Sequence, residues 1–384
     1  MELQTHIFSP AFEPVLDVFE QNFTQFEELG AGFAVILDGE PVMHITGGWA
    51  DKRKSVPYGK DTLVPVYSTT KGIAALALGG LVDAYASKGY DTLVSEVWPE
   101  FGVNGKENTT IGHIVSHQAG LPGFTDEIDP ALWLDPPACA AALATIAPMW
   151  EPGTAHGYHP LTWGYMVGEL ARRLEPNNQT LGQYIASTMT NTNGQMNDAT
   201  SPTPLIDFWI GLPESEHGRC AEITKPSQLA AFGKITPPRR AAFMTKWAAP
   251  NRNAKLWKEI EIPSANGHGT ALSIAQMYEP YAANGAQGNR HITVTPDMVR
   301  PFYPDTPDLV LDMNTSFSAG VMLNSHGHFG PNPGTIGHCG WGGSMAIADA
   351  DRHLTCAYVM NKQSNILVGD PRATALVSAV YGCL

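Results

Sequence analysis

Ser68-Thr69-Thr70-Lys71 is the stretch that decides the fold, and it lies where a helix is expected to begin. Residues three apart share one face of a helix, so the amine of Lys71 is expected beside the hydroxyl of Ser68. A serine becomes a good nucleophile when a neighbouring base removes its proton. The stretch suggests a Ser-Lys nucleophile, although such a pair alone also arises by chance. Apolar residues at helical spacing follow it: Ile73, Ala74, Leu76, Ala77, Leu78, Leu81, Val82 and Ala86.

The bulk composition predicts a globular chain that acts on small molecules. Its 384 residues are 43% hydrophobic, which is enough for one large domain or two interleaved domains. The formal net charge is −14, and charged residues make up only 16% of the chain. Nucleic acids and anionic membranes require a basic surface, so neither is an expected partner. Small neutral or mildly polar substrates fit better, and the oligomeric state is left open.

The cysteines and the N-terminus favour a cytoplasmic protein without a metal or organic cofactor. There is no Cys-x-x-Cys pair, and His326-Gly327-His328 lacks the downstream ligands that a zinc site would need. The first residues show neither the basic region nor the apolar region of a secretory signal. Reduced thiols are therefore expected for the five cysteines, which are Cys139, Cys220, Cys339, Cys356 and Cys383.

The two ends of the chain predict one antiparallel sheet with helices. Ser9-Pro10 is a typical helix start, and apolar residues recur at helical spacing as far as Gly30. Asp370-Pro371 predicts a last helix that runs to about Tyr381. Alternating patterns and turn residues predict strands over 32–37, 42–46, 344–348 and 354–360.

The middle of the chain is expected to be mainly helical. Residues 1–90 together with 266–384 are predicted to form an α/β sheet domain, and residues 91–265 a helical insertion. A cleft between the two is the expected active site. Residues 202–263 are rich in loop signals and fit a lid or a merely structural excursion equally well.

Three motifs in this order resemble the serine β-lactamase and penicillin-binding-protein superfamily, specifically its family VIII carboxylesterases. The Ser-x-x-Lys signature comes first, a Pro-Gly segment ending in a tyrosine comes second, and a glycine-rich strand comes third. Together with weaker similarities they span residues 30 to 362. The three motifs are Ser68-Thr69-Thr70-Lys71, the segment from Glu151-Pro152-Gly153 to Tyr158, and Gly337-His338-Cys339-Gly340-Trp341-Gly342-Gly343-Ser344.

The resemblance implies a β-lactamase/transpeptidase-like fold and a catalytic machinery. Ser68 would be the nucleophile, and Lys71 and Tyr158 would share the role of base as a coupled pair whose pKa values are both pushed below about 10. The backbone amides of Ser68 and Trp341 would bind the oxyanion. Gly340 would let its strand approach closely. His338 would lie beside the site, with substrate binding and plain packing about equally favoured.

Departures from the β-lactamase pattern favour an esterase. The Tyr-x-Asn motif is replaced by Tyr158-His159-Pro160, which removes an amide that contacts the substrate in β-lactamases. Lys-Thr-Gly is replaced by His338-Cys339-Gly340, and a histidine is mostly neutral at pH 7. We therefore expect hydrolysis of small, short-acyl carboxylic esters through a Ser68 acyl-enzyme, with weak β-lactam hydrolysis at most.

Four alternatives stay open at this level. A β-lactamase or an acyltransferase would use the same acyl-enzyme chemistry. A covalent penicillin-binding sensor, which acylates and never turns over, is less favoured. An α/β-hydrolase is poorly supported, because the nearest match to Gly-x-Ser-x-Gly fails at its last position, Ala346.

Overall fold

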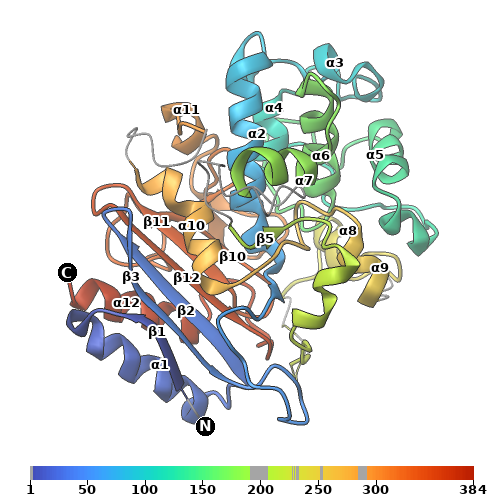
Figure 1. The fold of residues 1–384 in the computed structure, drawn as a ribbon. Helices are drawn as coiled ribbons and strands as arrows, with labels where there is room; N and C mark the ends of the chain where they lie inside the picture. The colour runs from blue at the N-terminus through green and yellow to red at the C-terminus, as the bar shows by residue number, and fades with distance from the viewer. Residues whose placement is uncertain are drawn as a thin grey trace.

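The computed structural model describes residues 3–190, 206–226, 228, 230, 233–250, 254–283 and 292–384. Its centre is a seven-stranded antiparallel sheet with the strand order β1-β3-β2-β12-β11-β10-β9 (Figure 1). The strands are β1 (Leu3–Phe8), β2 (Gly30–Leu37), β3 (Glu40–Gly48), β9 (Met322–Leu323), β10 (Ile336–Cys339), β11 (Met345–Asp349) and β12 (Leu354–Met360).

The two ends of the chain meet in the middle of this sheet, as predicted. Strand β2 pairs with β12 from Ala31 opposite Met360 to Leu37 opposite Leu354. A tight turn at Asp38 and Gly39, both with positive φ, joins β2 to β3. Because β2 and β12 are buried along almost their whole length, apolar residues occupy both of their faces.

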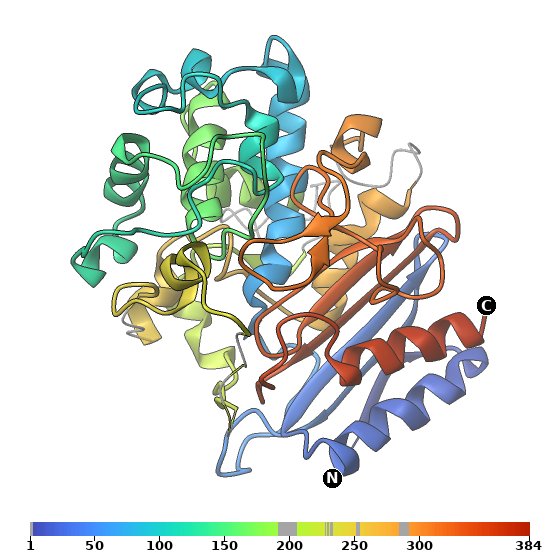
Figure 2. The same cartoon turned by 180° about the vertical axis from the view of Figure 1, so that it is seen from behind.

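Helices cover both faces of the sheet. Helices α1 (Glu13–Gln25) and α12 (Pro371–Gly382) lie side by side on one face (Figure 2). Helix α10 (Ala271–Ala282) packs against β12, β11 and β2 on the other. The first helix is shorter than predicted, because residues 3–8 form an edge strand and Pro10–Phe12 a 3-10 turn before it. Its predicted end at Gly30 is the first residue of β2.

A group of helices stands beside the sheet, with α2 (Thr70–Tyr85) at its centre. Helix α2 packs against α6 and α7, and 12 of its 16 residues are buried. None of the helices in the described part of the chain has the length and hydropathy needed to cross a bilayer. The other helices are α3 (Val94–Val97), α4 (Ile111–Val115), α5 (Pro136–Thr145), α6 (Thr162–Leu174), α7 (Leu181–Ile185), α8 (Pro237–Phe243), α9 (Ala254–Glu259) and α11 (Pro296–Val299).

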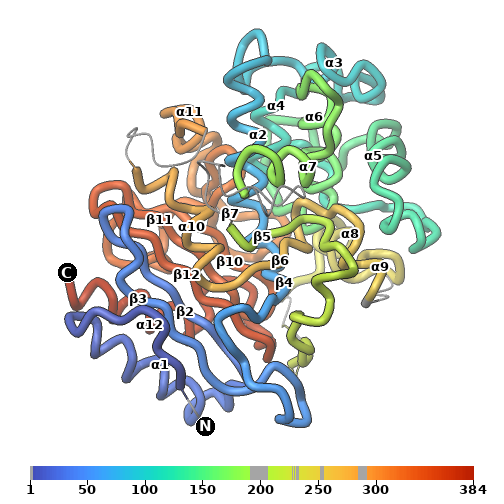
Figure 3. The backbone as a smooth tube through the Cα atoms, viewed as in Figure 1, coloured from blue at the N-terminus to red at the C-terminus, as the bar shows by residue number. Residues whose placement is uncertain are grey.

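Short strands connect the two parts of the molecule near the start of α2. They form a small sheet with the order β4-β6-β5 (Figure 3). The bounds are β4 (Val64–Pro65), β5 (Phe208–Trp209) and β6 (His268–Gly269), with a separate pair β7 (Thr306–Pro307) and β8 (Asn314–Thr315). Parts of the predicted 202–263 excursion lie outside the described residues. The described parts carry β5, α8 and α9, and the two-domain division stays a prediction.

Candidate active site

Ser68 lies on a single 3-10 turn, η2 (Tyr67–Thr69), that leads directly into α2. The preceding residue, Tyr67, has a φ of 48°, a left-handed conformation that is strained for a bulky side chain. A backbone hydrogen bond of 2.8 Å from Val66 N to Gly267 O joins this turn to the segment before β6. The turn places Ser68 at the N-terminal end of a helix, where the dipole favours developing negative charge.

Lys71 is fully buried one helical turn after Ser68, as the spacing predicts. Its Nζ lies 3.1 Å from Ser68 Oγ, 2.9 Å from Pro160 O and 3.0 Å from Ser264 O. Burial lowers the pKa of Lys71 well below its ordinary value, because no charge compensates the ammonium. A neutral amine has two N–H groups for the two carbonyls and one lone pair for the Ser68 hydroxyl. The geometry therefore suits a base.

Tyr158 completes the contacts around Ser68. It lies in the loop before α6 and is only 7% exposed, with its ring centroid 4.8 Å from Lys71 Nζ. Its backbone N–H donates to both carboxylate oxygens of the buried Asp308, at 3.1 Å each. Burial raises the pKa of Tyr158, against a hydrogen bond with Ser68 that lowers it.

The expectation that both pKa values fall is therefore wrong for Tyr158. A buried phenolate needs a cation to stabilise it, and a neutral Lys71 supplies none. Burial therefore shifts the two pKa values in opposite directions, and in each case it favours the neutral form, the amine of Lys71 and the phenol of Tyr158. The pair can still pass a proton between them, and Lys71 is the better suited of the two to act as the base, because its pKa is lowered and that of Tyr158 is raised.

Two buried histidines support this arrangement. His159 Nδ1 donates to Gly157 O (2.6 Å), and its Nε2 accepts from Leu121 N (2.8 Å), which fixes one neutral tautomer. Burial lowers the pKa of His159 to about 3. His117 Nδ1 accepts from His159 N at 3.1 Å, and its ring lies 4.8 Å from that of Tyr158. His117 thus supports both His159 and the ring of Tyr158.

The turn between β10 and β11 lies against the Ser68 turn. Ser344 Oγ donates to Val66 O at 2.7 Å and lies 3.1 Å from Thr69 Oγ1. A Cβ on Gly340 would lie 2.2 Å from Val66 O, so only glycine allows this contact. Trp341 follows Gly340 and lines the same cavities as Ser68. The third motif is therefore brought to the first, as expected.

His338 also reaches the site, and its protonation state follows from its contacts. Its Nδ1 donates to Cys339 O at 2.8 Å, so Nε2 carries the lone pair. Burial lowers the pKa of His338 to about 3. Nε2 is buried and has no hydrogen-bond partner among the described residues. It can accept a hydrogen bond but offers no positive charge to an anion.

Two apolar cavities meet at Ser68. The first has a volume of about 40 Å³ and extends past Tyr158 and His338. The second has a volume of about 260 Å³. Both share the lining residues Ser68, Pro160, Phe243 and Trp341. The first is completed by Leu311, Met322, Cys339, Leu367 and Val368, and the second by Tyr67, Leu161, Ala242, Ala248, Ala249, Pro250, Trp257 and Ala265.

Several of the residues in the site were not predicted from the sequence. Phe243 and Trp257 belong to the 202–263 excursion, which offers no motif and is brought to the site only by folding. Pro160 stands where the β-lactamase motif has an asparagine, and its carbonyl accepts a hydrogen bond from Lys71. Ser264 acts through its carbonyl in the same way. Backbone carbonyls leave no trace in residue identity, so no sequence signal points to them.

Comparison with known proteins shows the family. The Beta-lactamase family model matches residues 19–381, and the chain therefore belongs to the β-lactamase family. The prediction from the three motifs is confirmed, and so is the β-lactamase/transpeptidase-like fold.

The chain is similar to relatives named as esterases and to one named as a penicillin-binding protein homologue. It is 31% identical to the esterase/β-lactamase LipL of Mycobacterium tuberculosis, over 94% of this chain and 83% of that protein. A penicillin-binding protein homologue from Caulobacter crescentus has a TM-score of 0.91 at 41% identity, and both chains are covered completely. A family VIII carboxylesterase has a TM-score of 0.89 at 36% identity, also with complete coverage of both chains.

Proposed function

We propose that this protein hydrolyses small carboxylic esters with a short acyl group, through an acyl-enzyme on Ser68. One observation carries the proposal: the Ser68 hydroxyl lies 3.1 Å from Nζ of the fully buried Lys71, whose pKa is lowered by burial, and it opens onto two apolar cavities. The likeness to proteins named as esterases supports it. A neutral substrate also suits a site whose three nearest histidines are all kept neutral by burial.

In acylation, Ser68 Oγ attacks the ester carbonyl and its proton passes to the lone pair of Lys71. The tetrahedral oxyanion is bound by the backbone N–H groups of Ser68 and Trp341. When the C–O bond to the alcohol breaks, the Tyr158 hydroxyl protonates the leaving alkoxide and regains a proton from the ammonium of Lys71. Lys71 returns to its neutral form, ready to act on the next nucleophile.

In deacylation, water takes the place of the alcohol. Lys71 and Tyr158 take a proton from this water as it attacks the acyl carbon, and Ser68 Oγ leaves with a proton returned by the same pair. The buried lone pair of His338 Nε2 is available to orient the water. This gives His338 a binding role in place of plain packing.

The cavities suggest how an ester is placed. The 40 Å³ cavity is about three times the 10–15 Å³ that one water needs, which suits an acyl group of a few carbons. The 260 Å³ cavity, with Tyr67 and Trp257 in its wall, takes the alcohol part. A β-lactam is less favoured, because neutral His338 and Pro160 provide neither the cation nor the amide that its carboxylate and side chain would use.

Stopped-flow hydrolysis of a chromogenic ester series from acetyl to octanoyl, beside a chromogenic cephalosporin, tests the proposal. We expect turnover to be fastest for the shortest acyl groups and absent in Ser68→Ala, with the acyl group found on the Ser68 peptide by mass spectrometry. Unchanged turnover in Ser68→Ala would refute the mechanism. A single stoichiometric burst, or faster cleavage of the cephalosporin, would refute the esterase assignment.

A further inference from the structure

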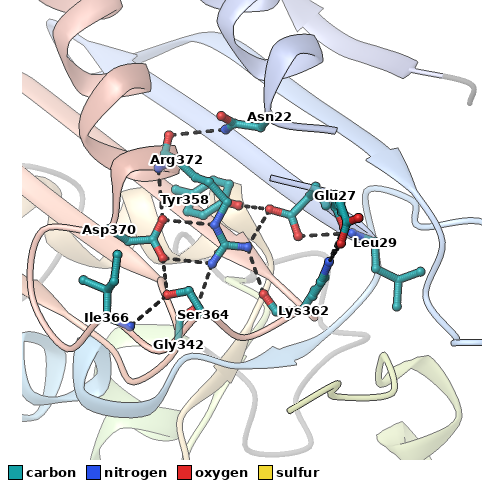
Figure 4. A network of polar contacts seen from close by, with 11 residues as sticks. Asn22, Glu27, Leu29, Gly342, Tyr358, Lys362, Ser364, Ile366, Asp370 and Arg372 are labelled. Atoms are coloured by element: carbon teal, nitrogen blue, oxygen red, sulfur yellow. Dashed lines mark hydrogen bonds and ion pairs between the residues drawn. The ribbon is translucent and has the colours of Figure 1, made fainter. Parts of the chain in front are cut away.

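A buried cluster of charged side chains lies directly behind the turn that carries Trp341. Arg372 is the second residue of α12 and is only 3% exposed. Its Nε and one Nη2 proton bind the carboxylate of Asp370, at 3.0 and 2.9 Å, and Nη1 binds Glu28 Oε2 at 2.9 Å (Figure 4). Nη1 also donates to Lys362 O at 2.9 Å.

The last N–H of Arg372 goes to the turn itself. Nη2 donates to Gly342 O at 2.8 Å, so all five donors of the guanidinium are used (Figure 4). Gly342 O also accepts from Ser364 N at 2.9 Å, and the Ser364 hydroxyl binds Asp370 at 2.5 Å. Arg372 Nη2 and Ser364 N thus both donate to the same carbonyl of the turn, Gly342 O.

Hydrogen bonds also hold the two carbonyls that precede Gly342 O in the turn. Gly340 O accepts from Gly343 N at 3.1 Å, and Trp341 O accepts from Gln363 Nε2 at 3.3 Å. Three consecutive carbonyls are therefore fixed. In a planar trans peptide the N–H points opposite to the C=O, so fixing Gly340 O also fixes the direction of the Trp341 N–H.

The charged cluster packs tightly against the turn at Gly343. Gly343 has a φ of 127°, and a Cβ there would lie 2.4 Å from Arg372 Nη2 and 2.7 Å from Asp370 Oδ2. The other side of the cluster is held by the sheet, because the hydroxyl of Tyr358 on β12 binds Glu28. Through its hydrogen bonds to Glu28 and to Gly342 O, the Arg372 guanidinium therefore connects the sheet and α12 to the turn.

We propose that Arg372 is a positioning residue for the oxyanion hole: by holding Gly342 O it fixes the plane of the peptide between Gly342 and Gly343, whose N–H holds Gly340 O and thereby sets the direction of the Trp341 amide. This inference rests on the proposed function, in which that amide binds the oxyanion. Buried ion pairs contribute little net stability compared with apolar side chains, so a cluster of this size suggests a task in specifying geometry. A displacement of about 1 Å in a catalytic group can cost about a hundredfold in rate.

The test compares Arg372→Lys, which keeps the charge but loses the planar fork, with Asn22→Ala. Asn22 donates to the backbone O of Arg372 at 3.3 Å and does not touch the guanidinium, so its loss weakens the same region without changing the turn. Both variants are assayed at a temperature at which circular dichroism shows them folded. Ser364→Ala is the milder variant to use where Arg372→Lys does not fold.

We expect Arg372→Lys to lower kcat by about ten- to a hundredfold with KM within about twofold of the native value. The affinity for an alkyl boronic acid, whose adduct on Ser68 carries the oxyanion, should fall by the same factor. Asn22→Ala should change neither, and Ser364→Ala should lower both by a few fold. If Arg372→Lys or Ser364→Ala showed the same kcat and the same boronate affinity as the native protein, the inference would be overturned. The proposed function would be unaffected by that result, because Ser68 would still be reactive. Absence of Ser68 chemistry in the native protein would instead refute the proposed function.

Discussion

Two buried cations lie on opposite sides of the candidate site, and burial affects them in opposite ways. Lys71, on the helical side, is surrounded by a hydroxyl and two carbonyls, and its pKa is lowered well below the usual value by burial. Arg372, on the sheet side, is equally inaccessible but faces the carboxylates of Asp370 and Glu28. Burial favours the neutral form of Lys71, whereas the neighbouring carboxylates favour the charged form of Arg372.

The difference lies in the partners, because both sites exclude water. A carbonyl dipole offers partial compensation for a charge, whereas a carboxylate offers a full countercharge. A base needs a lone pair, so carboxylates must be kept away from it. A fixed hydrogen-bonding scaffold needs a permanent charge and several donors, which arginine provides. Reactive and positioning roles are thus separated by local electrostatics within one site.

The largest expected effect comes from removing the neutral amine. Lys71→Met should lower kcat/KM for short esters by at least about 10³-fold, because the phenol of Tyr158, which also hydrogen-bonds Ser68, is a poor proton acceptor. Lys71→Arg should be as inactive, because a guanidinium does not deprotonate. Steady-state kinetics on both variants checks this. Substantial activity in Lys71→Arg would show that the base lies elsewhere.

The next largest expected effect is on the free energy of unfolding, which should change in opposite directions when Arg372 and Lys71 are replaced. Arg372→Met leaves two buried carboxylates without their cation and should cost about 3–5 kcal/mol of the free energy of unfolding. Lys71→Met should raise the free energy of unfolding at pH 7, because the native state no longer has to hold a lysine in its neutral form. Thermal and urea unfolding midpoints measure both. A loss of stability in Lys71→Met would argue that the amine is charged.

Tyr158 tests whether the uncharged phenol takes part in proton transfer. Tyr158→Phe keeps the ring and removes the hydroxyl, and we expect kcat to fall by about 10²-fold. The fall should be smaller for esters with good leaving groups, because a phenolate leaving group needs less protonation than an alkoxide. An effect under about threefold with alkyl esters would mean that the phenol is only structural.

The shape of the pH profile is the finest test. Below the native pKa of Lys71 the amine is protonated, so kcat/KM should fall tenfold for each pH unit; above that pKa it should level off, well before the usual lysine value of about 10.4. Between these two pKa values the unfolded chain binds one more proton at Lys71 than the native state does. The contribution of Lys71 to stability therefore rises with pH in this window and is absent in Lys71→Met. An inflection near pH 10 would contradict the lowered pKa.

Much of the fold follows from local patterns. The strands β2, β3, β11 and β12 and the helix α12 were predicted from alternation, turn residues and a Pro start, and the structure has them within a few residues. Strand β1 was missed, because a short edge strand with mixed polarity has no clear period. The Ser-Lys contact followed from helical spacing alone.

The sequence by itself determined the family, the order of the three motifs and the contact between Ser68 and Lys71, because these depend on residue types and on separations of a few residues. Only the tertiary structure decided which groups are charged. The pKa values of Lys71, Tyr158 and His338 depend on burial, and the bonds of Arg372 to Glu28 and Gly342 depend on partners far along the chain. Desolvation is a property of the folded environment, and no single residue carries it.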